Sequence, residues 1–364
     1  MEEKKILYLM HIDWNWIKQR PQYIAQELAK TYNVSVLYKY RYQRSIMQEG
    51  EASFCKDKLE VRPIYRIPVI ERWGIGKKIN KGIMKRAIQK KIKKLKPEFI
   101  YVTEPEQVEF LPEKITAKVI YDCMDNHAAF SEDTALQKKV IADEGKLANV
   151  ADCICISSQN LKNVFVNRYG KQIEDKCVLV RNGYNGKVLP AKASKNTGKE
   201  FVVTYIGTVS SWFDTDIIEK SLQDFPELIY EIYGPVDGSG VRLEQERVKY
   251  KGTVAHDKLP EVVKGCDCLI MPFKLNDVVT SVDPVKFYEY INFNRNIISV
   301  YYEEIDRFSP FVEFYHNYQE YKQVLSKLMK DNTVKYSEQQ RIKLLQDSTW
   351  DSRVKQIRRF IDQY

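Results

Sequence analysis

The chain has 364 residues, with 58 Lys and Arg against 49 Asp and Glu, 44% hydrophobic and 12% aromatic residues, and only 15 Gly and 13 Pro. This composition excludes collagen-like, low-complexity and largely disordered proteins. Domains usually contain about 100–200 residues, so the length predicts two domains, each with a core of its own.

The N-terminus and the cysteines indicate a cytoplasmic protein. No apolar run reaches the roughly 18 residues that a membrane-spanning helix needs, and the charged residues 1–5 lead directly into a short apolar segment. We therefore expect neither a membrane span nor a secretory signal. The seven cysteines are odd in number and lie mostly in apolar runs such as Cys153-Ile154-Cys155. We expect them to pack as small hydrophobic side chains, rather than to form disulfides or a zinc site.

Short apolar segments alternate with helical patterns along the whole chain. Strands are predicted in the first half at residues 5–10, 34–38, 99–103, 118–122, 152–157 and 178–183. After a linker at 189–199, strands are predicted at residues 201–207, 228–234, 248–252, 268–272 and 296–300. Continuous apolar strands that alternate with helices predict parallel sheets covered on both faces. Ligands bind such sheets beyond the carboxyl ends of the strands.

The segment 206–214 has the pattern of a phosphate-binding turn. A predicted strand ends in Gly207, hydroxyl residues follow, and a helix is expected to begin near Asp214. Free backbone amides and the helix dipole at such a turn attract anions. An ordinary strand-to-helix turn has the same pattern, which is neither a P-loop nor a dinucleotide fingerprint.

The segment 271–290 carries the strongest chemical signal. A helix is predicted to open near Pro284, with Asp283 as its cap, and Lys286 and Glu289 then lie on one face. A lysine offers a point charge for phosphate, and a carboxylate can accept two hydrogen bonds from a ribose diol. A surface ion pair would explain the same spacing equally well.

Several motifs, in chain order, resemble those of family 4 and related bacterial glycosyltransferases. They are residues 16–22 (WIKQRPQ), 121–125 (YDCMD), 182–183 (NG), 205–208 (YIGT), 212–214 (WFD) and 283–290 (DPVKFYEY). The resemblance is nearest to enzymes of cell-surface polysaccharide synthesis of the teichuronic-acid type. It implies the GT-B fold, an α/β architecture of two Rossmann-like domains that face a central cleft.

The resemblance also implies the domain roles. An acceptor-binding domain would cover residues 1–187, and a C-terminal helix, 348–364, would cross back to it. A nucleotide-sugar-binding domain would cover residues 188–347. The predicted nucleotide-sugar residues are Gly207, Thr208, Gly234, Val254, Ser281, Pro284, Val285, Lys286 and Glu289. Among them, Lys286 would hold the diphosphate and Glu289 the ribose. Ser281 stands where related enzymes usually carry a first glutamate.

Catalytic and acceptor residues are expected in the first domain. Asp125 is the first candidate for a base and Asp122 the second, and Lys286 would stabilise the departing diphosphate. The sequence does not choose between an inverting and a retaining reaction. Acceptor contacts are expected from His11, Trp14 and Arg20, although Trp14 could equally pack inside the domain. The resemblance implies metal-independent chemistry, with no cofactor besides a nucleotide-sugar donor, for which UDP is the expected nucleotide.

The segment 72–97 holds eleven Lys and Arg and no acidic residue. Removing these charges from the net charge of +9 leaves −2 for the rest of the chain. Its isoleucines recur at helical spacing, which predicts a helix or a helix pair with an apolar stripe. The stripe could pack on the sheet, or the segment could bind the anionic inner face of the cell membrane. Nucleic acid is not an expected partner.

These patterns predict a glycosyltransferase that moves a sugar from a nucleotide diphosphate sugar to a lipid-linked or growing cell-surface polysaccharide. It would act at the cytoplasmic face of the membrane. Two alternatives remain at this point: a nucleotide-sugar epimerase of the same fold, and a non-catalytic relative that binds glycan or protein.

Overall fold

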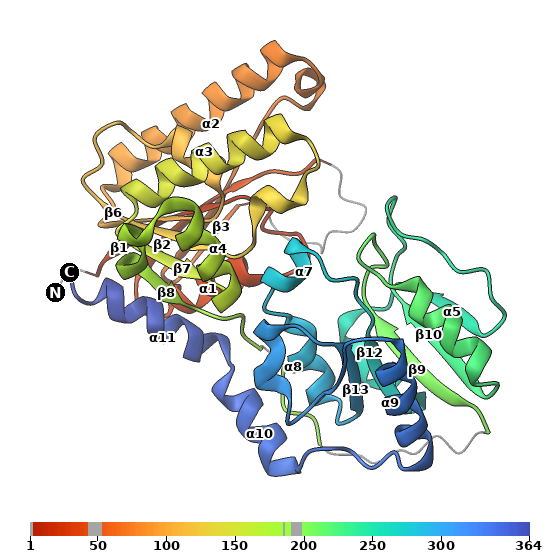
Figure 1. The fold of residues 1–364 in the computed structure, drawn as a ribbon. Coiled ribbons are helices and arrows are strands. Elements are labelled where there is room, and N and C mark those ends of the chain that lie inside the picture. The colour runs from red at the N-terminus through yellow and green to blue at the C-terminus, as the bar shows by residue number, and fades with distance from the viewer. Residues whose placement is uncertain (1–2, 43–52, 185, 191–198) are drawn as a thin grey trace. The chain divides into compact units, whose positions relative to one another are not determined.

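The computed structural model describes residues 3–42, 53–184, 186–190 and 199–364, so most of the predicted linker, 189–199, lies outside the described residues. The chain forms two compact units (Figure 1). The first unit comprises Met1–Gly183 together with Trp350–Tyr364, and the second comprises Tyr184–Thr349. These limits lie a few residues from the predicted boundaries at 187 and 348.

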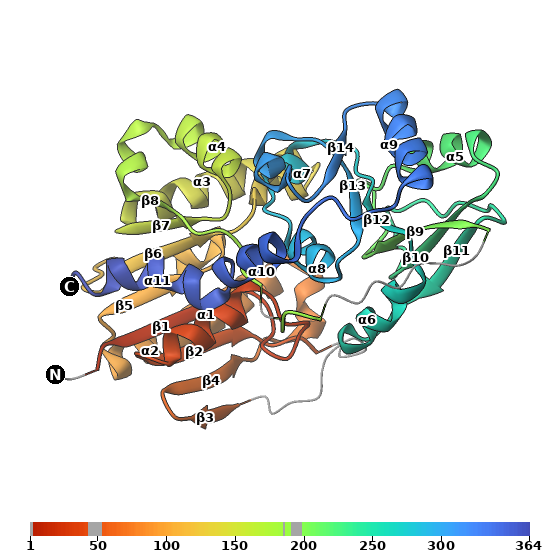
Figure 2. The same ribbon diagram turned by 90° about the horizontal axis from the view of Figure 1, so that it is seen from below.

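The first unit contains a sheet of eight strands in the order β3-β4-β2-β1-β5-β6-β7-β8 (Figure 2). The strands are β1 (Lys5–Met10), β2 (Asn33–Lys39), β3 (Phe54–Lys56), β4 (Leu59–Ile64), β5 (Phe99–Val102), β6 (Lys118–Cys123), β7 (Cys153–Ile156) and β8 (Cys177–Leu179). All pairings are parallel except that of β3 with β4. The strand order reverses at β1, between β2 and β5, and this reversal is the point at which such sheets bind ligands.

Helices cover both faces of the first sheet. They are α1 (Arg20–Ala29), α2 (Gly74–Leu95), α3 (Thr134–Val150), α4 (Gln159–Tyr169) and α11 (Trp350–Ile361), with the 3₁₀ helices η1 (Pro68–Arg72), η2 (Pro105–Phe110), η3 (His127–Phe130) and η4 (Lys171–Lys176). Alternate residues of β1 face opposite sides. Tyr8 belongs to a core shared with α1 and α11, whereas Leu9 belongs to a core shared with α2, α3 and α4.

The second unit contains a parallel sheet of six strands in the order β11-β10-β9-β12-β13-β14. The strands are β9 (Phe201–Ile206), β10 (Leu228–Tyr233), β11 (Val248–Gly252), β12 (Cys268–Met271), β13 (Asn296–Val300) and β14 (Glu313–Tyr315). This is the doubly wound order of a Rossmann fold, with its reversal between β9 and β12.

The second unit also has helices on both faces of its sheet. They are α5 (Thr215–Asp224), α6 (Leu259–Val262), α7 (Asp277–Ser281), α8 (Val285–Asn292), α9 (Tyr318–Lys330) and α10 (Glu338–Asp347), with η5 (His256–Lys258), η6 (Val263–Gly265) and η7 (Glu303–Phe308). One core contains residues of α5 and α9, and the other contains residues of α8 and α10. Every strand predicted from the sequence is present.

The structure departs from the predicted fold at the sheet edges. The hairpin β3–β4 and the strand β14 were not predicted. β4 contains Arg62 and Pro63, and only Val61 and Ile64 of its six residues are buried, so its apolar pattern is weak. The sequence predicted a parallel sheet, but β3 pairs with β4 in the antiparallel direction.

The basic segment forms one helix, α2, whose two halves differ. In the C-terminal half Ile88 is buried, and Ile92 and Leu95 pack against the core. In the N-terminal half Ile75 and Ile79 are exposed. The predicted apolar stripe therefore packs against the protein over only part of its length.

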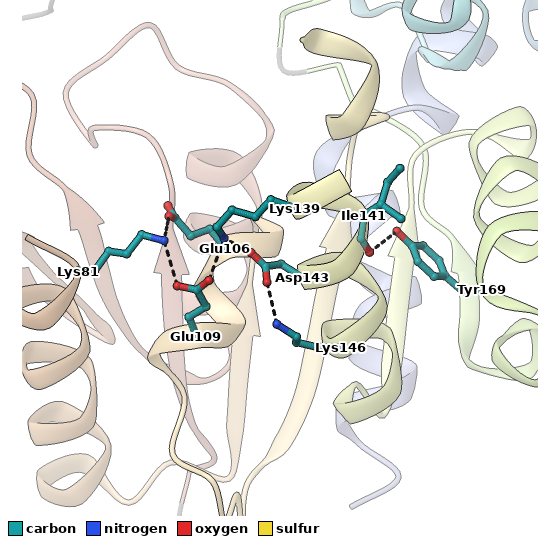
Figure 3. Close-up of polar contacts among 8 residues, drawn as sticks. All are labelled: Lys81, Glu106, Glu109, Lys139, Ile141, Asp143, Lys146 and Tyr169. Carbon is teal, nitrogen blue, oxygen red and sulfur yellow. Dashed lines mark hydrogen bonds and ion pairs between the residues drawn. The ribbon is translucent and has the colours of Figure 1, made fainter. Parts of the chain in front are cut away.

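An ion-pair network joins α2 to η2 and α3 (Figure 3). The ammonium group of Lys81 lies 2.8 Å from a carboxylate oxygen of Glu106 and 3.0 Å from one of Glu109. On the other side of η2, Lys139 of α3 lies 2.8 Å from Glu109 and also pairs with Asp143. Part of the positive charge of α2 is therefore neutralised inside the unit.

The described helices include none that combines the length and the apolar character needed to cross a membrane. All seven cysteines are free thiols, and five of them are buried.

Candidate functional site

Three glycine turns follow neighbouring strands of the second sheet. Gly207, Gly234 and Gly252 end β9, β10 and β11 with φ angles of 152°, 144° and 74°. The amide of Gly207 donates to the carbonyl of Tyr233 at 2.8 Å, and that of Gly234 donates to the carbonyl of Gly252 at 2.9 Å. A Cβ on Gly234 would lie 2.1 Å from the carbonyl oxygen of Gly207. The predicted turns are therefore in close contact, and a side chain at Gly234 would not fit.

The side chain of Lys286 reaches these turns from the first turn of α8. Its ammonium group lies 3.5 Å from the hydroxyl of Tyr205 and over the rings of Tyr205 and Phe273, at 5.2 and 5.9 Å from their centroids. A Cβ on Gly207 would lie 2.2 Å from the same nitrogen. No carboxylate pairs with Lys286 in the described part of the chain. The half-buried cation thus stands at the reversal of the strand order with its charge available to an anion.

Glu289, one turn further along α8, binds a residue that the sequence analysis did not select. Its Oε1 lies 2.8 Å from Nε2 of His256, which follows the turn after β11. This hydrogen bond raises the pKa of His256, although partial burial opposes the shift. The separation of 33 residues between the partners explains why no local pattern indicated the pair.

The remaining predicted nucleotide-sugar residues divide into exposed and buried positions. Thr208 and Val254 are half-exposed in the turns after β9 and β11, and Val285 is 40% exposed at the start of α8. Ser281 is 1% exposed, and its hydroxyl donates to the carbonyl of Asp277 at 2.6 Å. The structure thus uses the Ser281 hydroxyl to close the short helix α7.

The start of α8 differs from the prediction. Pro284 occupies the cap position, and the helix begins at Val285. Asp283 does not cap the helix, because its buried carboxylate pairs with Arg307 of η7. The Asp-Pro pair therefore anchors the helix start to a neighbouring element.

In the first unit, Arg20 and Asp122 form a buried ion pair. They are 5% and 0% exposed, and a guanidinium nitrogen lies 2.7 Å from the carboxylate. Arg20 also donates to the carbonyl of Val180 at 2.8 Å and to the side chain of Asn182 at 3.2 Å. Three of the recognised motifs therefore meet at one structural ion pair. This corrects the predicted roles of Arg20 in acceptor contact and of Asp122 as a base, since neither side chain is accessible.

Trp14 is also structural. It is 9% exposed, belongs to the core cluster of the first unit and packs edge-on against Phe54 with 5.8 Å between ring centroids. The packing alternative for this residue is therefore correct.

Asp125 and His11 lie at partly exposed positions near the carboxyl ends of β6 and β1. Burial raises the pKa of Asp125, while the charges of His127 and Arg20 oppose the shift. The rings of His11 and His127 lie edge to face with 6.5 Å between centroids. Asp125 is therefore accessible, whereas Asp122 is 0% exposed and paired with Arg20.

The sequence contains one Asp-x-Asp motif, a pattern that can hold a metal ion, at Asp214-Thr215-Asp216. Asp214 caps α5 by accepting the amide of Asp216 at 3.1 Å, and Asp216 lies 3.8 Å from the ammonium group of Lys274. The described residues contain no group of three or more His, Cys, Asp and Glu side chains that could hold a metal ion. Here the Asp-x-Asp sequence serves as a helix cap.

Comparison with known proteins shows which fold this is. No family model matches the chain, and no curated protein matches its sequence. Sucrose-phosphate synthase from Thermosynechococcus elongatus is similar in structure, with a TM-score of 0.74, 10% identity and 99% of each chain covered. Anabaena HepE, solved in complex with UDP and glucose, has a TM-score of 0.67 and 14% identity over 99% of this chain and 100% of its own. TarM has a TM-score of 0.67 and 12% identity over 97% of each chain. The predicted α/β architecture of two Rossmann-like units, the GT-B fold of these proteins, is confirmed.

Proposed function

We propose that the protein is a glycosyltransferase that transfers a sugar from UDP-sugar to a lipid-linked or growing cell-surface polysaccharide. The observation that carries the proposal is the group formed by Gly207, Lys286 and Glu289 at the strand reversal of the second sheet. A half-buried cation beside two glycine turns suits a diphosphate, and a carboxylate one helical turn away suits a ribose diol. The likeness to HepE, which binds UDP and glucose, supports the choice of nucleotide.

In the proposed reaction, the bond between the anomeric carbon and the diphosphate breaks while the acceptor oxygen bonds to that carbon. Lys286 stabilises the negative charge that develops on the departing UDP. Asp125 takes the proton of the acceptor hydroxyl, and the raised pKa of its carboxyl group suits this role. The proposal assigns the stabilising charge to Lys286 and needs no metal ion, so chelators should leave the rate unchanged.

The experiment that tests this function is calorimetric titration of the protein with UDP, ADP and GDP. We expect UDP to bind most tightly. Lys286→Ala should weaken binding by about 1–3 kcal/mol, roughly 5- to 150-fold, because a charge-assisted contact is lost. Glu289→Ala should weaken the binding of UDP, and it should weaken the binding of deoxy-UDP much less. Lys258→Ala, which removes an exposed lysine of the same unit, is the matched control. A folded protein that binds none of the three nucleotides would contradict the proposal.

We further propose that the protein attaches to an anionic membrane surface through η1 and α2. Five large apolar side chains are exposed there: Ile67, Val69, Trp73, Ile75 and Ile79, which we call the apolar α2 surface. Val69, Trp73 and Ile75 are 72%, 64% and 76% exposed. Exposed apolar side chains next to cations are typical of proteins that lie at the lipid interface.

Two further observations support this attachment. Asn80 of α2 accepts the amide of Ile67 at 2.9 Å and donates to its carbonyl at 3.0 Å, which fixes the start of the apolar α2 surface. Along the helix, cations are exposed and form no ion pair with any described residue: Lys77, Lys78, Lys85, Arg86, Lys90, Lys93 and Lys94. Lys81 and Lys91 differ, because they pair with carboxylates inside the unit. A surface with these two components is suited to an acceptor that is held in a membrane.

A further inference from the structure

A cavity of about 280 Å³ lies inside the first unit, beyond the carboxyl ends of β1, β2 and β4. The residues of its lining that matter here are His11, Asp13, Trp16, Lys39, Arg41 and Arg66. These three strands are neighbours in the sheet, and His11, next to the strand reversal, lies at the position where doubly wound sheets bind ligands. The volume suits a group of about the size of one sugar ring.

The wall of this cavity is basic. Lys39, Arg41 and Arg66 supply three cations, and no ion pair joins Lys39 or Arg41 to a carboxylate among the described residues. Asp13 is the one acidic residue of the lining, and it is 3% exposed. Its two carboxylate oxygens accept the amides of Asn15 at 2.9 Å and Arg41 at 2.7 Å. Asp13 therefore shapes the backbone of the cavity, and the side-chain cations of Lys39 and Arg41 remain for a ligand.

Two further side chains, those of Trp16 and Glu104, act on the cations of this cavity. The guanidinium group of Arg41 lies over the ring of Trp16, 4.1 Å from its centroid, which limits the directions that it can take. Glu104 interacts electrostatically with Lys39 and Arg66, and burial raises the pKa of its carboxyl group.

Thr103 holds the position of His11. Its hydroxyl accepts the backbone amide of His11 at 3.1 Å, lies 2.8 Å from Nδ1 of His11 and donates to the carbonyl of Leu9 at 3.0 Å. In the tautomer with the proton on Nδ1, that nitrogen donates to Thr103 and Nε2 is an acceptor. Burial, together with the charges of His127 and Lys39, lowers the pKa of His11 to about 3, so the ring is neutral at physiological pH.

We propose that this cavity binds the acceptor, and that the acceptor is a sugar that carries an oxyanion, either a phosphate or a carboxylate. Lys39, Arg41 and Arg66 bind the oxyanion, and Nε2 of His11 accepts a hydrogen bond from a sugar hydroxyl. The inference rests on the proposed function, because it names the acceptor class of the same enzyme. The contact between His11 and His127, two residues after Asp125, places the cavity beside the proposed base.

The test compares the binding of glucose 6-phosphate, glucuronate, glucose and inorganic phosphate, each measured by calorimetry at low ionic strength. We expect both anionic sugars, or the one whose oxyanion fits, to bind at least about tenfold more tightly than glucose and than inorganic phosphate. The double variant Lys39→Gln, Arg41→Gln should abolish this preference. The matched control Lys138→Gln, Lys171→Gln removes the same charge from exposed positions of the same unit and should retain the preference. Thermal unfolding of each variant establishes that it is folded.

A second variant, His11→Phe, tests the sugar contact separately. This variant should weaken the binding of the anionic sugars several-fold. It should leave the affinity for inorganic phosphate unchanged, because phosphate alone makes no contact with Nε2. Equal affinity for glucose and the anionic sugars would overturn the inference, as would a preference that survives in the folded double variant. Phosphate that binds as tightly as the sugar phosphate would overturn the assignment of a sugar site.

The two proposals fail in different ways. Binding of UDP without any preference for anionic sugars contradicts the cavity and leaves the glycosyltransferase proposal standing. Binding of anionic sugars without binding of any nucleotide contradicts the glycosyltransferase proposal, and with it the role of the cavity as an acceptor site.

Discussion

At the scale of single residues, the geometry around Gly234 shows why the predicted nucleotide turn needs glycine. Its φ angle of 144° is one that side-chain-bearing residues rarely adopt, and the backbone of Gly207 occupies the place of its missing Cβ. Lys286 occupies the corresponding place beside Gly207. Two positions without side chains therefore make room for the ammonium group of Lys286 and for the close contact between the two turns, where we propose that the diphosphate binds.

We predict that Gly234→Ala lowers the free energy of unfolding by about 2–4 kcal/mol, because it combines a strained backbone with a clash against backbone atoms. It should also reduce UDP affinity. Urea unfolding and calorimetry measure the two effects. Gly238→Ala is the matched control, since a Cβ there meets nothing within 4 Å. Equal effects of the two substitutions would contradict the close contact between the turns at Gly207 and Gly234.

The pair of His256 and Glu289 predicts a dependence on pH. Because the pKa of His256 is raised in the folded protein, the pair stabilises the fold fully below the unfolded pKa of about 6.5. This contribution is lost as the pH rises through the higher, folded pKa. The His256 side chain is 76% exposed, so solvent screening keeps the contribution below about 1 kcal/mol.

An NMR titration of the imidazole resonances measures this effect directly. The pKa of His256 should lie above 6.5 in the wild type and should fall towards it in Glu289→Gln. Added UDP should also lower it, if the ribose replaces the imidazole on Glu289. A pKa that does not respond to Glu289→Gln would contradict the hydrogen bond.

At the scale of elements, the two halves of helix α2 have different roles although they share one sequence pattern. Its C-terminal half completes the core of the first unit through Ile88, and it is joined to β4 by the pair between Lys91 and Glu60. Burial opposes ionisation of Glu60, but hydrogen bonds from Lys91, Ser35 and Arg62 lower its pKa to about 2. Its N-terminal half leaves its apolar side chains exposed. The element is therefore both a structural helix and a candidate membrane contact.

We predict that Lys85→Gln, Lys90→Gln, Lys93→Gln and Lys94→Gln, combined in one variant, reduce binding to vesicles of phosphatidylglycerol at least about tenfold, because each cation near an anionic surface contributes about 1 kcal/mol. Co-sedimentation measures the bound fraction. Lys91 is left unchanged because it pairs with Glu60. The control variant replaces exposed lysines elsewhere: Lys138, Lys171, Lys249 and Lys258.

The apolar α2 surface is tested separately with Ile75→Ser combined with Ile79→Ser. This variant should weaken binding to vesicles at high salt, where the electrostatic contribution is screened. If neither variant differs from the control in vesicle binding, the proposed attachment of α2 to membranes is incorrect.

At the scale of the whole molecule, the chain returns to its first unit at its end. Val354, Ile357 and Ile361 of α11 are buried in the core shared with β1 and α1. Trp350 stacks on Tyr23 with 5.3 Å between ring centroids. The stability of the first unit therefore depends on residues that follow the entire second unit in the sequence.

We predict that Ile357→Ala destabilises the first unit by about 2–4 kcal/mol, because it leaves a cavity in a closed core. Hydrogen exchange measured by mass spectrometry should show lost protection in β1 and β2, with β9 and β10 unchanged. Arg359→Ala, an exposed change on the same helix, is the control. Equal loss of protection in both sheets would contradict the assignment of α11 to the first unit.

The sequence by itself determined the class of fold and the local spacing of the residues proposed to bind the nucleotide. Strands such as β1 and β9 are continuous apolar runs. A strand that is buried on both faces of a sheet needs apolar side chains at successive positions, so the run itself predicts the strand. The spacing of Lys286 and Glu289 is equally local, because residues three positions apart in a helix lie on the same face.

Only the tertiary structure decided what the polar residues do. Arg20 and Asp122, 102 residues apart, became a buried structural pair because the strand order brings α1 and β6 together. His256, which follows β11, lies beside Glu289 of α8 in the second unit. In the first unit, Lys39, Arg41 and Arg66 line one cavity because β2 pairs with both β1 and β4. These contacts depend on strand order and on the burial that follows from it, and neither can be read from the neighbours of a residue in the chain.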